Sequence, residues 1–117
     1  MEIRKTYQNV KPELLYDEIK DLALKQGVVE EESKLETYAL PGDSSSFISR
    51  GTITFRMQGK PDKSAAQNCL RVHIVGSARG ETKVIFDITE ELFPREKLNA
   101  LLGDLDFIFG SYEVAGV

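Results

Sequence analysis

The sequence has little of the chemistry on which most catalytic and metal-binding sites depend. Its 117 residues include one Cys, one His and no Trp. One Cys cannot form an internal disulfide, and one Cys with one His cannot supply a His/Cys zinc site within a single chain. A glycine-rich phosphate loop ending in GK[ST] is also missing. We therefore expect neither a cofactor nor a metal. Whether the chain is an enzyme stays open, with a non-enzymatic function favoured.

Long apolar runs are absent as well. No stretch approaches the roughly 20 apolar residues that a membrane-spanning helix requires. The opening residues, Met-Glu-Ile-Arg-Lys, lack the apolar core and cleavage site of a signal peptide. A lone Cys69 fits a reducing compartment, so we expect a cytoplasmic protein. With 41% hydrophobic and 29% charged residues, the composition is that of one globular domain over 1–117.

The net charge of -4 conceals an uneven distribution along the chain. Residues 1–46 carry 6 basic and 10 acidic side chains, and residues 84–117 carry 2 basic and 7 acidic ones. The middle, 47–83, carries 7 basic and only 2 acidic side chains. Such an asymmetry can mark a binding surface, although acidic flanks could also neutralise the basic middle in the fold.

Hydrophobic periodicity predicts seven elements. Alternation predicts strands over 2–8, 29–40, 47–58, 69–76 and 82–89, and apolar spacing of three and four residues predicts helices over 12–26 and 94–109. Turn-forming residues separate them at 41–46 and 76–80. The three consecutive glutamates Glu30–Glu32 resist pairing with another chain and place the second strand at a sheet edge. We therefore predict an α+β fold with two layers in the order β-α-β-β-β-β-α, its antiparallel sheet carrying both helices on one face.

The inward side of these strands and of the last helix is apolar. These side chains could line a ligand cavity between the sheet and the C-terminal helix, or they could fill the core at close-packed density. The candidate lining residues are Phe47, Ile53, Phe55, Met57, Leu70, Val72, Ile74, Phe86, Leu101, Leu105 and Phe109.

The outward side of three successive strands carries basic residues, which form a predicted basic patch. Guanidinium groups match carboxylates and phosphates because their donors form a planar fork. The face lacks the aromatic residues that stack on single-stranded bases, so nucleic acid is disfavoured as a partner. A protein partner, a homodimer or a solvated surface remain open. The patch consists of Arg50, Arg56, Arg71, His73 and Lys83.

Two side chains have the reactivity that catalysis could use. Histidine is the side chain whose ordinary pKa lies near neutrality, and His73 could pair with Asp87 on the next strand as an acid–base couple. Cys69 has no second histidine nearby in sequence to activate its thiol. Neither residue is assigned a catalytic role.

Three segments carry a family resemblance. They are the run Val10-Lys11-Pro12-Glu13-Leu14-Leu15-Tyr16 after the first strand, the late strand from Gly80 to Thr89, and the amphipathic C-terminal helix. Together they resemble a shortened helix-grip domain of the START, birch-pollen-allergen and polyketide-cyclase-like superfamily. The same element order occurs in the repeat of the TATA-box-binding protein. The helix-grip resemblance implies an apolar ligand held between the sheet and the last helix.

Three functions follow from these observations. The leading hypothesis is a small binding module that holds an apolar small molecule or lipid beneath the C-terminal helix. The alternative is a protein-interaction module or homodimer that uses the basic outer face. The third is a small enzyme of the polyketide-cyclase-like type.

Overall fold

The computed structural model describes residues 1–40, 43–57, 68–76 and 80–114, with the backbone alone described for 39–40 and 43–47. The elements follow the predicted order, and the predicted α+β class is confirmed. Their bounds are β1 (Glu2–Gln8), α1 (Pro12–Leu24), β2 (Val28–Leu40), β3 (Asp43–Met57), β4 (Asn68–Gly76), β5 (Glu81–Ile88), α2 (Arg95–Phe109) and the 3-10 turn η2 (Gly110–Tyr112).

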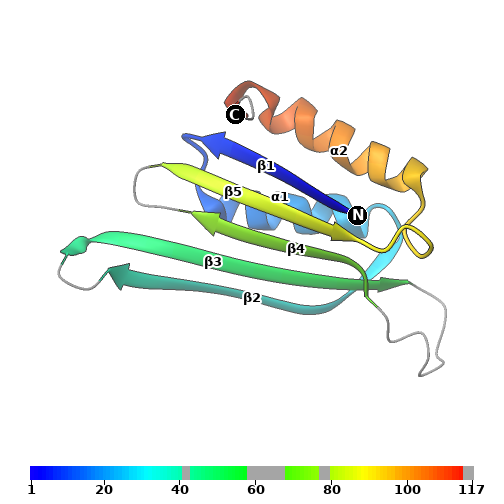
Figure 1. Cartoon of the computed structure of the whole chain (residues 1–117), viewed down its shortest axis with the longest axis horizontal. Coiled ribbons are helices and arrows are strands. Elements are labelled where there is room, and N and C mark those ends of the chain that lie inside the picture. The colour runs from blue at the N-terminus through cyan, green and yellow to red at the C-terminus, as the bar shows by residue number, and fades with distance from the viewer. Residues whose placement is uncertain (41–42, 58–67, 77–79, 115–117) are drawn as a thin grey trace.

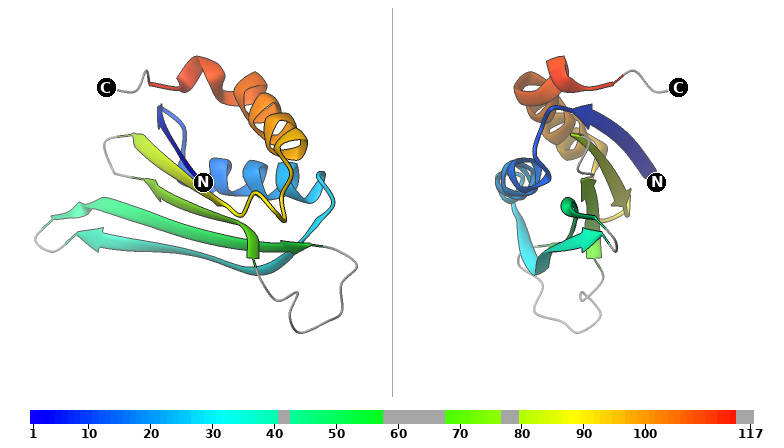
Figure 2. Two further views of the ribbon diagram at one scale, coloured as in Figure 1. Left: turned by 45° about the vertical axis from the view of Figure 1, so that its right-hand side comes forward. Right: turned by 90° about the vertical axis from the view of Figure 1, so that its left-hand side faces the viewer.

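The five strands form one antiparallel sheet in the order β1-β5-β4-β3-β2. Both helices lie on the same side of this sheet, with α1 behind the strands and α2 along the β1 side (Figures 1 and 2). The sheet therefore has a face covered by the helices and a face that no described helix covers. We call the second one the open face.

Local sequence explains where the helices begin and end. Pro12 occupies the first helical position of α1, where its missing N–H costs no hydrogen bond, and Glu13 follows in the first turn. The chain leaves α1 through Gly27, whose φ of 86° suits a residue without a side chain. Pro94 precedes α2 in the extended conformation and cannot continue a helix backwards.

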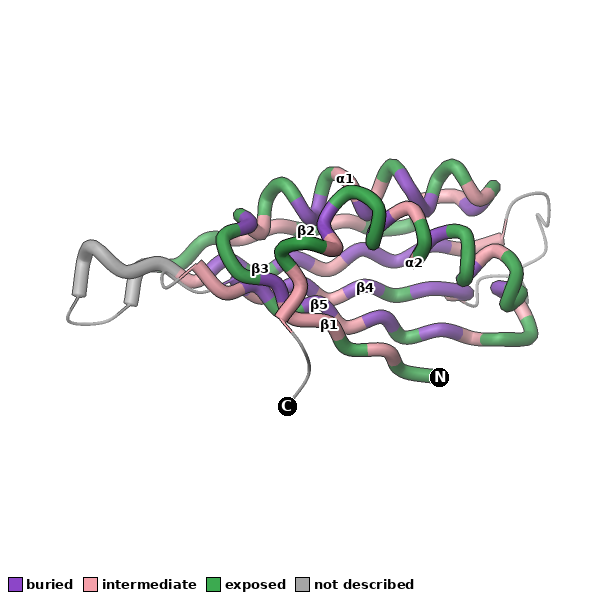
Figure 3. The backbone as a smooth tube through the Cα atoms, turned by 90° about the horizontal axis from the view of Figure 1, so that it is seen from above, coloured by how far each residue is buried: buried purple, intermediate pink, exposed green. Residues whose placement is uncertain are grey.

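Alternating burial along the strands produces the core (Figure 3). The burial pattern of β5 alternates between buried and more exposed residues, as the period of two requires. Its buried side chains meet the apolar stripes of both helices in one continuous cluster. Gly51 lets α1 approach the sheet closely, since a Cβ there would lie 2.8 Å from the Tyr16 ring.

The two edges of the sheet differ. Beside β1, the backbone N–H of Val114 donates to the Thr6 carbonyl at 2.8 Å, and the backbone of Glu113 forms an isolated antiparallel β-bridge with Tyr7. The Lys5 ammonium reinforces this contact, 3.1 Å from the Glu113 carboxylate. Beyond β2, no described strand pairs with the chain. The prediction that this strand lies at an edge is therefore confirmed.

One predicted turn is partly wrong. Asp43–Ser46 carry turn-forming residues, yet β3 begins at Asp43, which pairs with Leu40 across the hairpin. Backbone pairing with β2 does not depend on side-chain type, so the ladder overrides local preference here. Residues 41–42, the 58–67 connection and most of the second predicted turn, 77–79, lie outside the described residues.

Candidate functional site on the open face of the sheet

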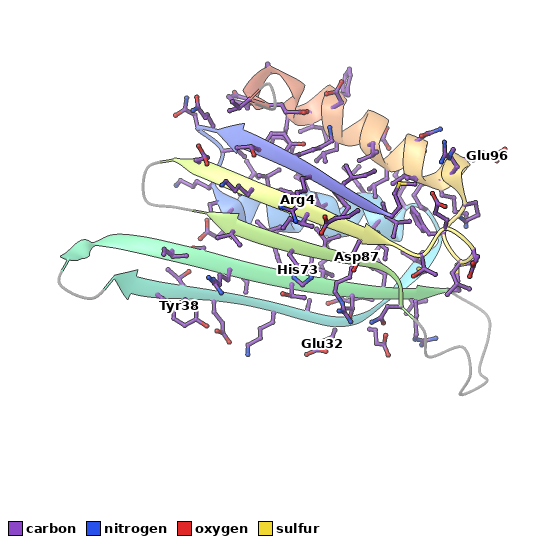
Figure 4. The ribbon with its side chains drawn as sticks, in the orientation of Figure 1. Arg4, Glu32, Tyr38, His73, Asp87 and Glu96 are labelled. Atoms are coloured by element: carbon purple, nitrogen blue, oxygen red, sulfur yellow. The ribbon has the colours of Figure 1, made fainter. Side chains whose placement is uncertain are left out.

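The strand registers bring outward side chains into rows across the sheet. The middle row runs, from β2 to β1, through Lys34, Thr52, His73, Ile85 and Arg4. The two ends of this row, Lys34 and Arg4, are cationic. The three residues between them are half-buried. Figure 4 shows Arg4 and His73 on the open face of the sheet.

Acidic residues enter the neighbouring rows. One row runs through Glu32, Thr54, Arg71, Asp87 and Glu2, and the other through Glu36, Arg50, Val75, Lys83 and Thr6. Cross-strand neighbours of opposite charge interact favourably in a sheet. The open face is therefore a mixed surface whose cations and anions lie beside one another.

A shallow depression lies at the β2, β3 and β4 side of this face, with a volume of about 300 Å³. Its floor includes the His73 imidazole, whose Nδ1 is 3.3 Å from the Thr52 hydroxyl oxygen. Thr54 is buried and donates a weak hydrogen bond to the Glu32 carbonyl at 3.5 Å. We call this hollow the central depression. Its lining residues are Glu32, Lys34, Thr52, Thr54, Arg71 and His73.

A second, smaller hollow of about 180 Å³ adjoins it and is lined by Asn68, Arg71, Asp87 and Thr89. With its amide oriented to satisfy both neighbours, Asn68 donates to the Glu31 carboxylate and accepts from the Arg71 guanidinium at 3.2 Å. Arg71 thus lies between the two hollows, and its hydrogen bond fixes one side of the guanidinium.

Ion pairs neutralise several of the face's cations. Lys34 lies 2.6 Å from Glu36, and Arg4 lies 3.1 Å from Glu2. The hydrogen bond to Glu36 raises the pKa of the Lys34 ammonium above its ordinary value. Exposed pairs of this kind contribute little to stability, so these side chains can exchange partners at low cost.

All five residues of the predicted basic patch belong to strands that place them on the open face. Arg50, Arg71 and Lys83 are exposed, whereas His73 and Arg56 are half-buried, Arg56 lying opposite Val29. Sequence reasoning missed Lys34 and Arg4 as members of this surface. The alternation of side chains along β2 and β1 is compatible with an outward position for both residues. The order of strands in the sheet, which brings β2 and β1 beside the middle strands, depends on contacts between distant parts of the chain.

His73 and Asp87 lie on the same face of adjacent strands as diagonal neighbours, and they are not directly opposite each other. Asp87 lies directly opposite Arg71, while His73 lies opposite Ile85 on β5 and Thr52 on β3. A shift of two residues in the β4–β5 pairing would place them directly opposite, and the length of the predicted turn did not fix that register.

The predicted lining residues lie in the core between sheet and helices. Ile53, Phe55, Leu70, Val72, Ile74, Phe86, Leu101 and Leu105 are each 0% exposed and belong to one core cluster. Phe109 is 4% exposed and Met57 is half-buried against the cluster. The side chain of Phe47 lies outside the described part of the structure. For a ligand to bind among these side chains, the sheet and the helices packed on it would have to separate.

Cys69 lies where the pairing of β3 with β4 shifts by one residue. Its thiol is buried and donates to the Phe55 carbonyl with 3.5 Å between sulfur and oxygen. Burial raises the pKa of this thiol, which opposes thiolate formation. Within the described residues, no three His, Cys, Asp or Glu side chains gather as a metal site would require, and no helix there is long and apolar enough to cross a membrane.

Comparison with known proteins adds no relative to this picture. No protein-family model, no curated protein and no solved structure matches the chain. The helix-grip and TATA-box-binding-protein resemblances therefore stay predictions.

Proposed function

We propose that the chain is a protein-interaction module whose open face binds an acidic segment of a partner protein. The observation that carries this proposal is the central depression, where Lys34, Arg71 and His73 lie beside the hydroxyls of Thr52 and Thr54. One carboxylate of the partner would lie in this depression. The flanking cations would contact the rest of the acidic segment.

The donors suit a carboxylate ligand. A guanidinium can donate two parallel hydrogen bonds to one carboxylate, and hydroxyls can complete its shell. Asn68 holds one side of Arg71, which reduces the side-chain freedom that binding would otherwise remove. Glu32 lines the other wall of the depression and would direct the ligand toward Arg71.

The surroundings favour a protein over a bare anion. Half-buried Ile85, Val75 and Ile48 lie among the charges of the same face. Apolar side chains surrounded by a polar rim are typical of protein interfaces. Aromatic platforms for nucleic-acid bases are not among the described residues of the central depression.

Fluorescence anisotropy with a labelled peptide rich in Asp and Glu would test the proposal. We expect saturable binding that weakens as salt increases, because exposed charges are screened. Arg71→Gln should weaken it by about tenfold, the cost of one charge-assisted contact. Glu32→Gln should strengthen binding, since it removes a like charge from the depression.

Lys25→Gln is the matched control. Lys25 is exposed beside α1 and lies 3.8 Å from Asp104, so it is a paired cation like Lys34 but belongs to the helical side. Its loss should leave binding unchanged. Equal losses of peptide affinity for Lys25→Gln and Arg71→Gln would mean non-specific attraction. Tighter binding of a labelled oligonucleotide than of the peptide would indicate that nucleic acid is the partner. Either result would refute the proposal.

A further inference from the structure

The free edge of β2 offers a second interaction surface, separate from the open face. A sheet edge exposes a row of backbone donors and acceptors that can pair with another strand. The opposite edge of the sheet is occupied in part, because Glu113 and Val114 run beside β1. Figure 1 shows β2 along the border of the sheet, with no described segment beyond it.

The regular part of this edge is bounded on both sides. The pairing of β2 with β3 shifts between Glu30 and Glu32 and again between Ala39 and Leu40. Between these shifts the ladder runs without interruption. Irregularities disrupt pairing locally, so an added strand would find a straight template only in this central stretch.

The sequence of that stretch is complementary to itself. In a symmetric antiparallel pair of identical strands, one residue lies opposite its own copy. If that residue is Leu35, then Lys34 lies opposite Glu36 of the second copy, and Glu36 lies opposite its Lys34. On the helical side, Ser33 lies opposite Thr37, so two hydroxyl side chains meet.

Other symmetric registers are worse. Centring on Lys34 or on Glu36 places like charges directly opposite each other, which is destabilising. Centring on Ser33 does pair Glu32 with Lys34, but the ladder then runs into the irregularity at Glu31. Of these four registers, the Leu35-centred one alone combines opposite charges with an uninterrupted ladder.

The side chains involved are available. The side chains of Lys34 and Glu36 retain 66% and 35% of their exposure, and Tyr38 is 48% exposed. Figure 4 shows Glu32 and Tyr38 projecting from β2 at the border of the sheet. In the Leu35-centred register these two would lie opposite each other, so each Tyr38 ring would cover the stem of a Glu32.

We infer that the chain forms a symmetric homodimer in which the two β2 strands pair antiparallel about Leu35, joining two sheets into one. All helices of the dimer then lie on one side, and the two open faces form a continuous surface. The inference rests on the β2 edge. Because Lys34 also lines the central depression, Glu36→Lys is the variant that separates the dimer from binding of an acidic partner.

Charge reversal tests both the dimer and its register. Sedimentation equilibrium of the wild type should show a dimer. Lys34→Glu and Glu36→Lys should each weaken it by about tenfold, because two attractive pairs become repulsive. Mixing these two variants should restore association, as should the double variant Lys34→Glu/Glu36→Lys. Circular dichroism of each variant checks that the monomer remains folded.

Cross-linking tests the register independently. Cys69 is buried, so cysteines introduced on β2 react against a low background. Under mild oxidation, Leu35→Cys should form a disulfide dimer, because directly opposite residues lie within disulfide reach. Ser33→Cys and Thr37→Cys should each fail alone and cross-link when mixed. A monomeric wild type, a dimer insensitive to charge reversal, or cross-linking of Ser33→Cys alone would overturn the inference.

Binding of the acidic peptide should be measured on the Glu36→Lys variant, which weakens the dimer and leaves every lining residue of the central depression unchanged. If peptide binding survives while dimerisation is lost, the two functions are separate. If peptide binding fails and the dimer persists, the proposed function fails and the dimer stands.

Discussion

The hydroxyl of Tyr7 is the least satisfied polar group in the described core. The residue is 0% exposed, and its hydroxyl oxygen has no hydrogen-bond partner in the structure. Burial raises the pKa of the phenol, and the nearby Glu113 and Asp106 carboxylates raise it further. The side chain therefore stays neutral, and it contributes through its ring, which packs edge-on against Phe109 at 6.2 Å between centroids.

Removing this hydroxyl should stabilise the protein. An unsatisfied buried polar group costs about 1–3 kcal/mol, and phenylalanine keeps the ring and its contact with Phe109. We expect Tyr7→Phe to raise the free energy of unfolding by about 1 kcal/mol. Urea denaturation followed by circular dichroism would measure the change. A loss of stability would mean that the hydroxyl makes a favourable contact in solution.

At the scale of elements, two glycines test how closely the helices pack. A Cβ at Gly76 on β4 would collide with the Pro12 ring at the start of α1, whereas a Cβ at Gly103 in α2 would meet nothing within 4 Å. Gly76→Ala should lower the free energy of unfolding by about 2 kcal/mol through overpacking. Gly103→Ala should raise it by about 1 kcal/mol through helix propensity. Thermal or urea unfolding of both variants checks the pair, and equal effects would contradict the packing described.

The contact between α1 and β2 predicts a pH dependence. The Ser33 hydroxyl donates to the Glu30 carboxylate and lowers the pKa of Glu30 below its ordinary 4.5, as does the Lys20 ammonium at 3.2 Å. A lowered pKa means that the ionised form stabilises the fold above pH 4.5 and that this contribution disappears as acid protonates it.

Glu30→Gln should therefore lower the free energy of unfolding by less than about 1 kcal/mol at neutral pH and leave it unchanged at strongly acidic pH. Melting temperatures of the wild type and the variant, measured from neutral to acidic pH, should converge as the pH falls through the acidic range. Glu2→Gln is a suitable comparison, since Glu2 pairs with Arg4 on an exposed part of β1. A difference for Glu30→Gln that grows in acid would contradict the assigned pKa direction.

Local periodicity predicted the elements and their faces because neighbouring side chains alternate whatever the fold. It placed Ile53 inward and Thr52 outward correctly. It could not place β1 beside β5, because this pairing joins chain segments almost a domain apart. Arg4 therefore entered the candidate site only with the structure. Asp43 was misassigned to a turn because its preference for turns is weaker than the hairpin ladder that includes it.

At the scale of the whole molecule, the charge asymmetry acquires a spatial meaning. Much of the basic middle of the sequence lies on β3, β4 and β5, whose outward side chains form the open face. The surplus of acidic residues in 84–117 lies largely on and around α2, on the other side of the sheet. The overall charge of -4 therefore says little about which partners the open face attracts.

The central claim is that this open face, and no other surface, receives an acidic segment. Titration of the isotope-labelled protein with the Asp- and Glu-rich peptide, followed by NMR amide shifts, tests it most directly. The account predicts that shifts concentrate at Thr52, Thr54, Arg71 and His73 and stay small along α1 and α2. Shifts concentrated on the helices, or spread evenly over the molecule, would contradict it.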